Sequence, residues 1–190
     1  MLTESQLQLL RNAIDAETDP ELVTYRDLGQ TGLVADWYNT AHPSVIAWNN
    51  YARWADVQNA IDYTKYTPTV PNMPTDTAGT NRLIGILVKL NVQQNMLLGS
   101  RDGFVDATNI SNVDAIIDTV TGIQAGVGGA VVAPGGSSGV NVANALTRYA
   151  TRAEAVFGGT DVTKGTITAK VLTWMDIVTE RDVNAAMALP

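Results

Sequence analysis

Two segments of this chain share a short pattern, and this repetition constrains the fold more than any other feature of the sequence. Each segment starts with a run rich in β-branched or aromatic residues, at residues 45–51 and 165–172, which favours a strand. Each then reaches Trp-x-Asp followed by Val or Ile, at Trp54 and Trp174, and continues with helical spacing. Because we find no other strand signals to pair with these runs, we expect them to pair with each other as antiparallel strands.

The two copies of the pattern differ in what precedes and follows them, so they do not require a duplicated domain. They are better explained as the closure of one domain, in which strands from distant parts of the chain lie side by side. Asp56 and Asp176 would then lie in the first turns of two helices, where the positive end of the helix dipole stabilises a carboxylate. Trp54 and Trp174 would anchor the starts of these helices in the core.

Helical signals dominate the rest of the chain. Thr3 and Gln6 form a candidate capping box, and Asp19-Pro20-Glu21 is typical of a second helix start. Apolar residues at helical spacing predict further helices over residues 31–39, 56–61, 81–98, 111–120, 142–157 and 174–189. We therefore predict a mainly α fold, a helical bundle-like single domain over residues 1–190 with the small two-stranded antiparallel β element and a long Gly-rich loop.

Two irregular segments interrupt the predicted helices, over residues 63–80 and 122–141. The first contains three prolines between residues 63 and 74, and we expect Tyr63 and Tyr66 to hold it against the body of the domain. The second carries seven glycines among small apolar residues. This composition is better suited to ordering against a partner than to remaining solvated, so the segment is a candidate binding loop.

Composition limits the classes of function. The net charge is -7 and the pI is about 4.5, which disfavours binding to nucleic acid phosphates. Cysteine is absent, which excludes disulfides, thiolate metal sites and a cysteine nucleophile. Charged residues make up only 16%, so much of the surface could be covered by copies of the same chain; a modestly charged monomer is the alternative. We find no secretory signal and no apolar run of membrane-spanning length, and expect a soluble protein made in the cytoplasm.

Motifs of known chemistry are not recognisable in the sequence. His42 is the single histidine and precedes a proline, so we interpret it as a turn or capping residue rather than a catalytic or metal-binding one. The Gly-rich segment lacks the lysine and the glycine spacing of nucleotide-binding loops. Asp114 and Asp118 are spaced as the solvated face of a helix. We therefore expect no catalysis, no cofactor and no metal.

Arg148 and Arg152 are the most distinctive charged pair. At a spacing of four on the predicted helix 142–157, they would lie on one face near Glu154. They could form an anion site, but salt bridges within or between subunits are the interpretation that we favour.

Several segments together resemble a known group of proteins. They are Asp36-Trp37-Tyr38-Asn39, residues 45–66 with Trp54-x-Asp56-Val57 and Asp62-Tyr63-Thr64, Thr80-Asn81-Arg82 with residues 91–98, residues 147–157 with Arg-x3-Arg-Ala-Glu, and Leu172-Thr173-Trp174-x-Asp176-Ile177. In this order they resemble tailed-bacteriophage head–tail connector (adaptor or head-completion) proteins. The resemblance touches most of the chain from about residue 31 onward, and its motifs are structural rather than catalytic.

The resemblance implies a structural virion protein that is not an enzyme. It would form a homo-oligomeric ring, often of twelve copies, in the neck of the virion after synthesis in the host cytoplasm. Its partners would be the portal protein and a tail terminator or other neck or tail protein, with DNA passing through without specific binding. Alternatives are another virion structural protein, such as a tail terminator or a capsid-associated protein, or a small ligand-binding module or hydrolase.

Known adaptors commonly insert a C-terminal tail into the portal, whereas this sequence ends soon after a predicted helix. We therefore expect docking through the Gly-rich segment or through residues 63–74. The residues that we expect at interfaces are Arg148, Arg152, Gly128, Val131, Val132, Tyr63 and Tyr66.

Overall fold

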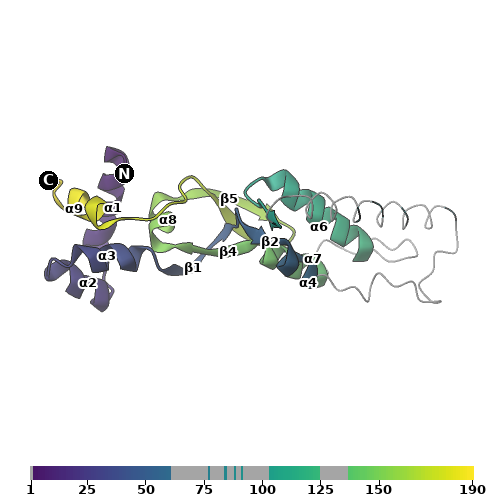
Figure 1. Ribbon diagram of the computed structural model, residues 1–190, viewed down its shortest axis with the longest axis horizontal. Coiled ribbons are helices and arrows are strands. Elements are labelled where there is room, and N and C mark those ends of the chain that lie inside the picture. The colour runs from purple at the N-terminus through teal and green to yellow at the C-terminus, as the bar shows by residue number, and fades with distance from the viewer. Residues whose placement is uncertain are drawn as a thin grey trace. The chain divides into compact units, whose positions relative to one another are not determined.

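The computed structural model of the chain describes residues 2–60, 77, 84, 88, 91, 103–124 and 137–190, which form helices and strands in a mixed α/β arrangement (Figure 1). The chain divides into two compact units. The first comprises Met1–Ala47, Tyr149–Asp161 and Lys170–Pro190, and the second comprises Trp48–Arg148 and Val162–Ala169. The expectation of one domain over residues 1–190 stays a prediction.

The first unit gathers helices from both ends of the chain, whose termini lie close together (Figure 1). These helices are α1 (Glu4–Ala16), α2 (Pro20–Asp27), α3 (Thr31–Tyr38), α8 (Arg152–Phe157) and α9 (Glu180–Met187). Helix α9 packs against α1 and α3, while α2 packs against α3 and α8 against α1. The three N-terminal helices confirm the helices predicted from capping signals and apolar spacing.

Local sequence explains where the first two helices begin. The Thr3 hydroxyl accepts from the Gln6 amide at 3.3 Å, and the Gln6 side chain accepts from the Thr3 amide at 2.9 Å. This reciprocal arrangement is the predicted capping box. At the second helix the Asp19 carboxylate accepts from the Glu21 amide at 3.0 Å, and Pro20 occupies the first helical position, where no amide is needed.

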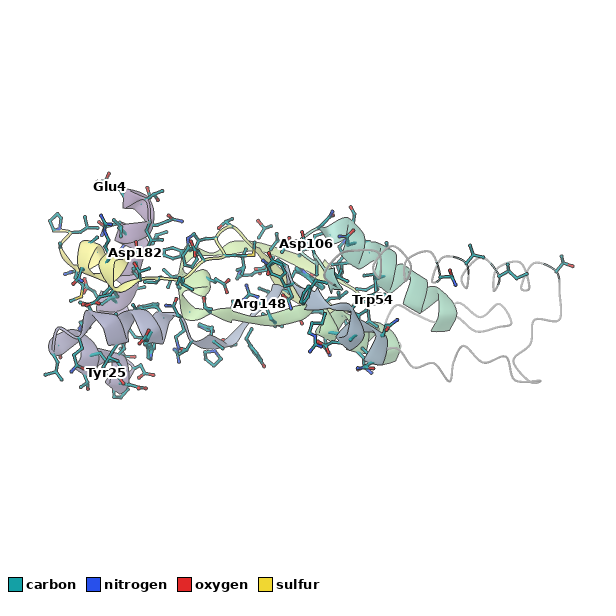
Figure 2. All side chains as sticks on the ribbon, in the orientation of Figure 1. Glu4, Tyr25, Trp54, Asp106, Arg148 and Asp182 are labelled. Atoms are coloured by element: carbon teal, nitrogen blue, oxygen red, sulfur yellow. The ribbon has the colours of Figure 1, made fainter. Side chains whose placement is uncertain are left out.

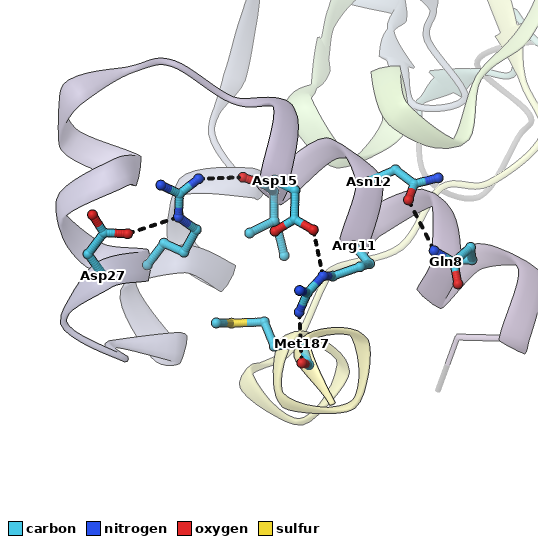
Figure 3. Close-up of polar contacts among 8 residues, drawn as sticks. Gln8, Arg11, Asn12, Asp15, Asp27 and Met187 are labelled. Atoms are coloured by element: carbon cyan, nitrogen blue, oxygen red, sulfur yellow. Dashed lines mark hydrogen bonds and ion pairs between the residues drawn. The ribbon is translucent and has the colours of Figure 1, made fainter. Parts of the chain in front are cut away.

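The core of the first unit is apolar and is held at its edges by two arginines. Its fully or almost fully buried side chains include Leu10, Ile14, Leu22, Val34, Tyr38, Val178, Val183 and Ala186. Arg11 donates to the Met187 carbonyl at 2.7 Å, and Arg26 donates to the Ile14 carbonyl at 3.3 Å (Figure 3). These bonds use carbonyls near helix C-termini, which lack helical partners, and they tie α1 to α9 and to α2.

A four-stranded sheet has the order β4 (Thr147–Thr151), β1 (Ala41–Trp48), β6 (Ile167–Leu172), β5 (Gly159–Lys164). Strands β1 and β6 are parallel, with Ala47 opposite Lys170. Strands β5 and β6 follow each other through a two-residue connection that begins at Gly165, whose φ is 59°. Such a short connection joins only antiparallel strands, so the sheet is mixed.

The predicted fold class is therefore wrong: the chain is not mainly α with a two-stranded antiparallel element. The two predicted strands are neighbours, but they are parallel, which the long chain between them permits. Strands β4 and β5 were not predicted. Predicted helix 142–157 is divided into α7 (Ser137–Ala145), β4 and α8. A capping box between Thr151 and Glu154 starts α8, and the β-branched and aromatic residues before it favour the strand.

The predicted final helix also starts later than expected. Helix α9 begins after Thr179, so Trp174 and Asp176 precede it. The ring of Trp174 packs edge-on against Phe157, with 4.5 Å between the ring centroids. The Asp176 carboxylate accepts from the next amide rather than lying in a first helical turn. The prediction that Trp174 and Asp176 start the final helix is therefore wrong, whereas the strand predicted before them is present as β6 and Trp174 does pack against the core.

The Trp-x-Asp part of the first copy lies in the second unit, where its predicted helix start is confirmed. Buried Trp54 starts α4 (Trp54–Asn59), and Asp56 lies in its first turn. Strand β2 (Ala52–Arg53) pairs antiparallel with β3 (Phe104–Val105), a small sheet that was not predicted. Helix α7 packs against α4 and against α6 (Ile110–Gln124), which confirms the helix predicted over residues 111–120.

The remaining predictions for the second unit fall partly or wholly outside the described residues. Predicted helix 81–98 is described only at Ile84, Val88 and Asn91, which are helical. Segment 63–80 is described only at Thr77. Both ends of the predicted Gly-rich loop are helical, because α6 and α7 extend into it, and residues 125–136 lie outside the described part.

Candidate interface site

The structure separates the residues that we expected at interfaces. Gly128, Val131, Val132, Tyr63 and Tyr66 lie outside the described residues, so nothing tests them. Arg148 lies on β4 (Figure 2), and Arg152 is the first residue of α8. The two arginines therefore do not share a helix face, and the expectation of i,i+4 stacking is wrong. Each arginine's place at an interface stays a prediction.

Arg152 lies on an aromatic platform at the end of α3. Its guanidinium carbon is 3.8 Å from the centroid of the Trp37 ring, within the range of a cation–π contact. Trp37 in turn meets Tyr38 edge-on, with 5.0 Å between ring centroids and 77° between ring planes. Both aromatic residues are buried, since 7% of Trp37 and 1% of Tyr38 is exposed. The guanidinium therefore lies on a buried pair of aromatic rings.

Thr40 fixes the orientation of the arginine. The Arg152 amide donates to the Thr40 carbonyl at 2.9 Å, and Arg152 Nε donates to the Thr40 hydroxyl at 3.1 Å. That hydroxyl donates to the Trp37 carbonyl at 2.6 Å. The two terminal nitrogens, Nη1 and Nη2, have no hydrogen-bond partner within the described part of the chain. The outer edge of the guanidinium is thus available to a ligand.

Two small pockets flank the Arg152–Trp37 pair. The α1 pocket has a volume of about 210 Å³ and is lined by Arg152, Trp37, Ala13, Glu17, Tyr38, His42, Ala155 and Val156. The α2 pocket has a volume of about 240 Å³ and is lined by Arg152, Trp37, Glu21, Tyr25, Leu33, Asp36 and Thr40. Pockets for drug-sized ligands are roughly 300–1,000 Å³, so these two are better matched to a single inserted side chain.

Two of the residues that line the α1 pocket, His42 and Tyr38, carry further hydrogen-bond donors. His42 Nδ1 accepts from the amides of Ser44 and Val45, both at 3.2 Å, so the neutral ring carries its proton on Nε2. The ring thus caps two nearby amides, which agrees with the predicted capping role, but His42 lies in β1 and not in a turn, and the sequence did not indicate its place beside a pocket. The Tyr38 hydroxyl is buried and has no partner among the described residues. Burial and then the charge of Glu17 raise the pKa of Tyr38, against the opposing effect of Arg152, so the hydroxyl stays protonated.

Two carboxylates around the pockets, those of Glu17 and Glu21, accept hydrogen bonds from groups other than Arg152. Glu17 accepts from the amides of Thr18 and Asp19 at 2.9 and 3.1 Å. Glu21 accepts from the Tyr25 hydroxyl at 2.7 Å, and this hydrogen bond raises the pKa of Tyr25. No acidic side chain in the described ranges lies within 4.0 Å of the Arg152 guanidinium.

Glu154, which we expected beside the arginines, serves the start of α8. Its carboxylate accepts from the Thr151 amide at 2.7 Å, and its amide donates to the Thr151 hydroxyl at 3.1 Å. Only 4% of Glu154 is exposed. The sequence signal for this role was present, because a Thr followed three residues later by Glu is a capping-box pattern.

Within the described ranges, no group of three or more histidine and acidic side chains is arranged to hold a metal ion. No helix in the same ranges combines the length and apolar character needed to span a membrane. None of the protein families, curated proteins or solved structures compared with this chain matches it.

Proposed function

We propose that this chain is a structural virion protein of a tailed-phage neck, a ring-forming head–tail connector that joins the portal to the tail without catalysing a reaction. Its partners would be further copies of itself, the portal protein, and a tail terminator or another neck or tail protein. It would be made in the host cytoplasm and would act in the virion. The sequence resemblance set out above is the starting point of this proposal.

The observation that carries the proposal is the display of large apolar side chains on both units. In the second unit Tyr51 and Phe104 meet edge-on at 6.0 Å, yet 68% of Tyr51 and 39% of Phe104 is exposed. In the first unit Met175 and Ile177 are exposed in the segment before α9, as are Leu28 and Leu33 near α3. Single exposed apolar residues are ordinary, but clustered aromatic residues are typical of the anchors of protein–protein interfaces.

Charge and pocket size also support an assembly role. A net charge of -7 repels DNA, which suits a subunit lining a channel through which DNA moves without binding. The α1 and α2 pockets are of the size that receives a side chain from another chain. Both features agree with a protein whose function lies in its contacts with copies and partners.

The test is the assembly state of the purified chain. Native mass spectrometry and negative-stain electron microscopy at micromolar concentration should show a closed ring, with twelve copies expected. The ring should bind the purified portal protein, and cryo-electron microscopy of the virion should place it in the neck. A chain that stays monomeric alone and with the portal would refute the proposal. A ring located at the tail terminator position or on the capsid would support the alternative virion roles.

A further inference from the structure

We propose that the α1 pocket receives a carboxylate side chain from a second copy of this chain, which pairs with Arg152. This inference rests on the proposed function to the extent that copies must associate. It assigns a specific contact to that association and names the residues of the receiving side.

The first argument is the geometry of Arg152. The Trp37 ring supports one face of the guanidinium, and Thr40 holds Nε, while Nη1 and Nη2 have no hydrogen-bond partner among the described residues. A planar fork of two N–H donors matches the two oxygens of a carboxylate. Because the side chain is already held in place, less conformational entropy is lost when the ligand binds.

The second argument is the lining of the pocket. Ala13, Ala155 and Val156 provide apolar walls, which strengthen an ion pair by excluding water. The Nε2 proton of His42 and the unpartnered hydroxyl of Tyr38 are two more donors among the lining residues. Glu17 also lines the pocket, so its charge offsets that of Arg152, but the guanidinium and these two donors outnumber its one carboxylate and favour a ligand that accepts hydrogen bonds.

The third argument identifies the source of the carboxylate. The chain has 19 acidic and 12 basic residues, so each copy carries surplus carboxylates. Four basic side chains of the described residues pair with Asp15, Asp27, Asp114 and Asp161 of the same chain, whereas Arg152 pairs with none of its acidic residues there. A second copy supplies the missing charge, and a volume of about 210 Å³ suits one side chain.

Replacing Glu17 should strengthen self-association, which is the opposite of the effect expected for replacing Arg152. Its carboxylate lines the same pocket and would repel an incoming carboxylate. Glu17→Gln keeps an oxygen that can accept from the Thr18 and Asp19 amides, so the local turn is retained. A role of Arg152 in packing alone predicts no gain of association in this variant.

The experiment is sedimentation velocity of the full chain over a range of protein concentrations. Arg152→Gln should weaken self-association about tenfold or more, since it removes a charged hydrogen-bonded pair. Arg152→Lys should weaken it less, and Glu17→Gln should strengthen it. The matched control is Arg181→Gln, which removes the same charge from an exposed residue of α9 and should leave association unchanged. Circular dichroism of each variant establishes that it is folded.

A competition measurement on the wild-type chain adds a test that does not depend on a variant alone. Sodium propionate should dissociate the wild-type assembly more than sodium chloride at equal ionic strength, and the two salts should act alike on Arg152→Gln. If Arg152→Gln assembled as well as wild type, or if propionate acted on wild type no more than chloride does, this inference would be overturned and the connector proposal would stand. A wild-type chain that does not self-associate would overturn both.

Discussion

The carboxylate of Asp182 links the two ends of the chain, and its replacement tests how the first unit is held together. Asp182 lies on α9 (Figure 2), and only 4% of it is exposed. It accepts from the Leu2 amide at 3.1 Å, from the Thr179 amide at 3.1 Å and from the Thr179 hydroxyl at 2.5 Å. One side chain thus caps α9 and holds the segment that precedes α1.

The expected cost follows from these contacts. Asp182→Ala removes a helix cap worth about 1 kcal/mol. It also leaves the buried Leu2 amide without its hydrogen bond to a charged group, which is worth about 2 kcal/mol. We therefore expect the free energy of unfolding to fall by about 3 kcal/mol. Gln6→Ala is the matched control, because Gln6 holds the same position in the exposed capping box of α1 and should cost less than about 1 kcal/mol.

The pH dependence of stability tests whether the ionised form of Asp182 is the one that stabilises the fold. Burial alone would raise the pKa of Asp182, but the hydrogen bonds from Thr179 and Leu2 outweigh it and hold the pKa below its usual value. A lowered pKa in the folded chain gives stability that is complete above about pH 4, the unfolded value, and is lost as the pH falls through the folded value. Wild type should therefore lose its advantage over Asp182→Asn below about pH 4.

Urea unfolding followed by circular dichroism and tryptophan fluorescence measures both effects. An Asp182→Ala variant that loses no more stability than Gln6→Ala would show that the link to Leu2 contributes nothing. A difference between wild type and Asp182→Asn that stays constant from about pH 7 to pH 3 would show that the ionised form is not the one stabilised.

Three further predictions concern the stability of the first unit. Gly159→Ala should destabilise the chain by about 2 kcal/mol or more, because the added Cβ would lie 2.5 Å from a backbone carbonyl oxygen of β6. Gly32→Ala in α3 should instead stabilise the chain by about 0.5 kcal/mol, because its added Cβ would have no contact nearer than 3.8 Å. Thermal unfolding compares the two variants. Asn39→Ala should lower the free energy of unfolding by about 2 kcal/mol and speed proteolysis between β6 and α9. The reason is that the Asn39 side chain donates to the Val178 carbonyl at 2.7 Å and accepts from the Val178 backbone amide at 2.9 Å. Unchanged proteolysis would contradict this. Tyr38→Phe should leave the dissociated chain as stable as wild type in urea unfolding, or more stable by up to about 1 kcal/mol. The reason is that the buried Tyr38 hydroxyl has no hydrogen-bond partner in the described ranges. A marked loss of stability would show that the hydroxyl has a partner.

Features set by near neighbours in the chain could be predicted from the sequence. The start of α1 depends on Thr3 and Gln6, and the start of α2 on Asp19 and Pro20, so a few adjacent residues were enough. The strand at residues 147–151 was missed because apolar residues of α7, β4 and α8 together imitate helical spacing. The capping box that divides them was visible in the sequence and was not used.

By itself the sequence determined the first two helices, their caps and the neighbouring positions of the two predicted strands. The tertiary structure decided that these strands run parallel, because two more strands complete the sheet around them. It also decided the surroundings of Arg152, since Thr40 and Arg152 are 112 residues apart in the chain. Spacing along a sequence reports contacts between near neighbours, whereas the Arg152 platform exists only after distant helices have packed.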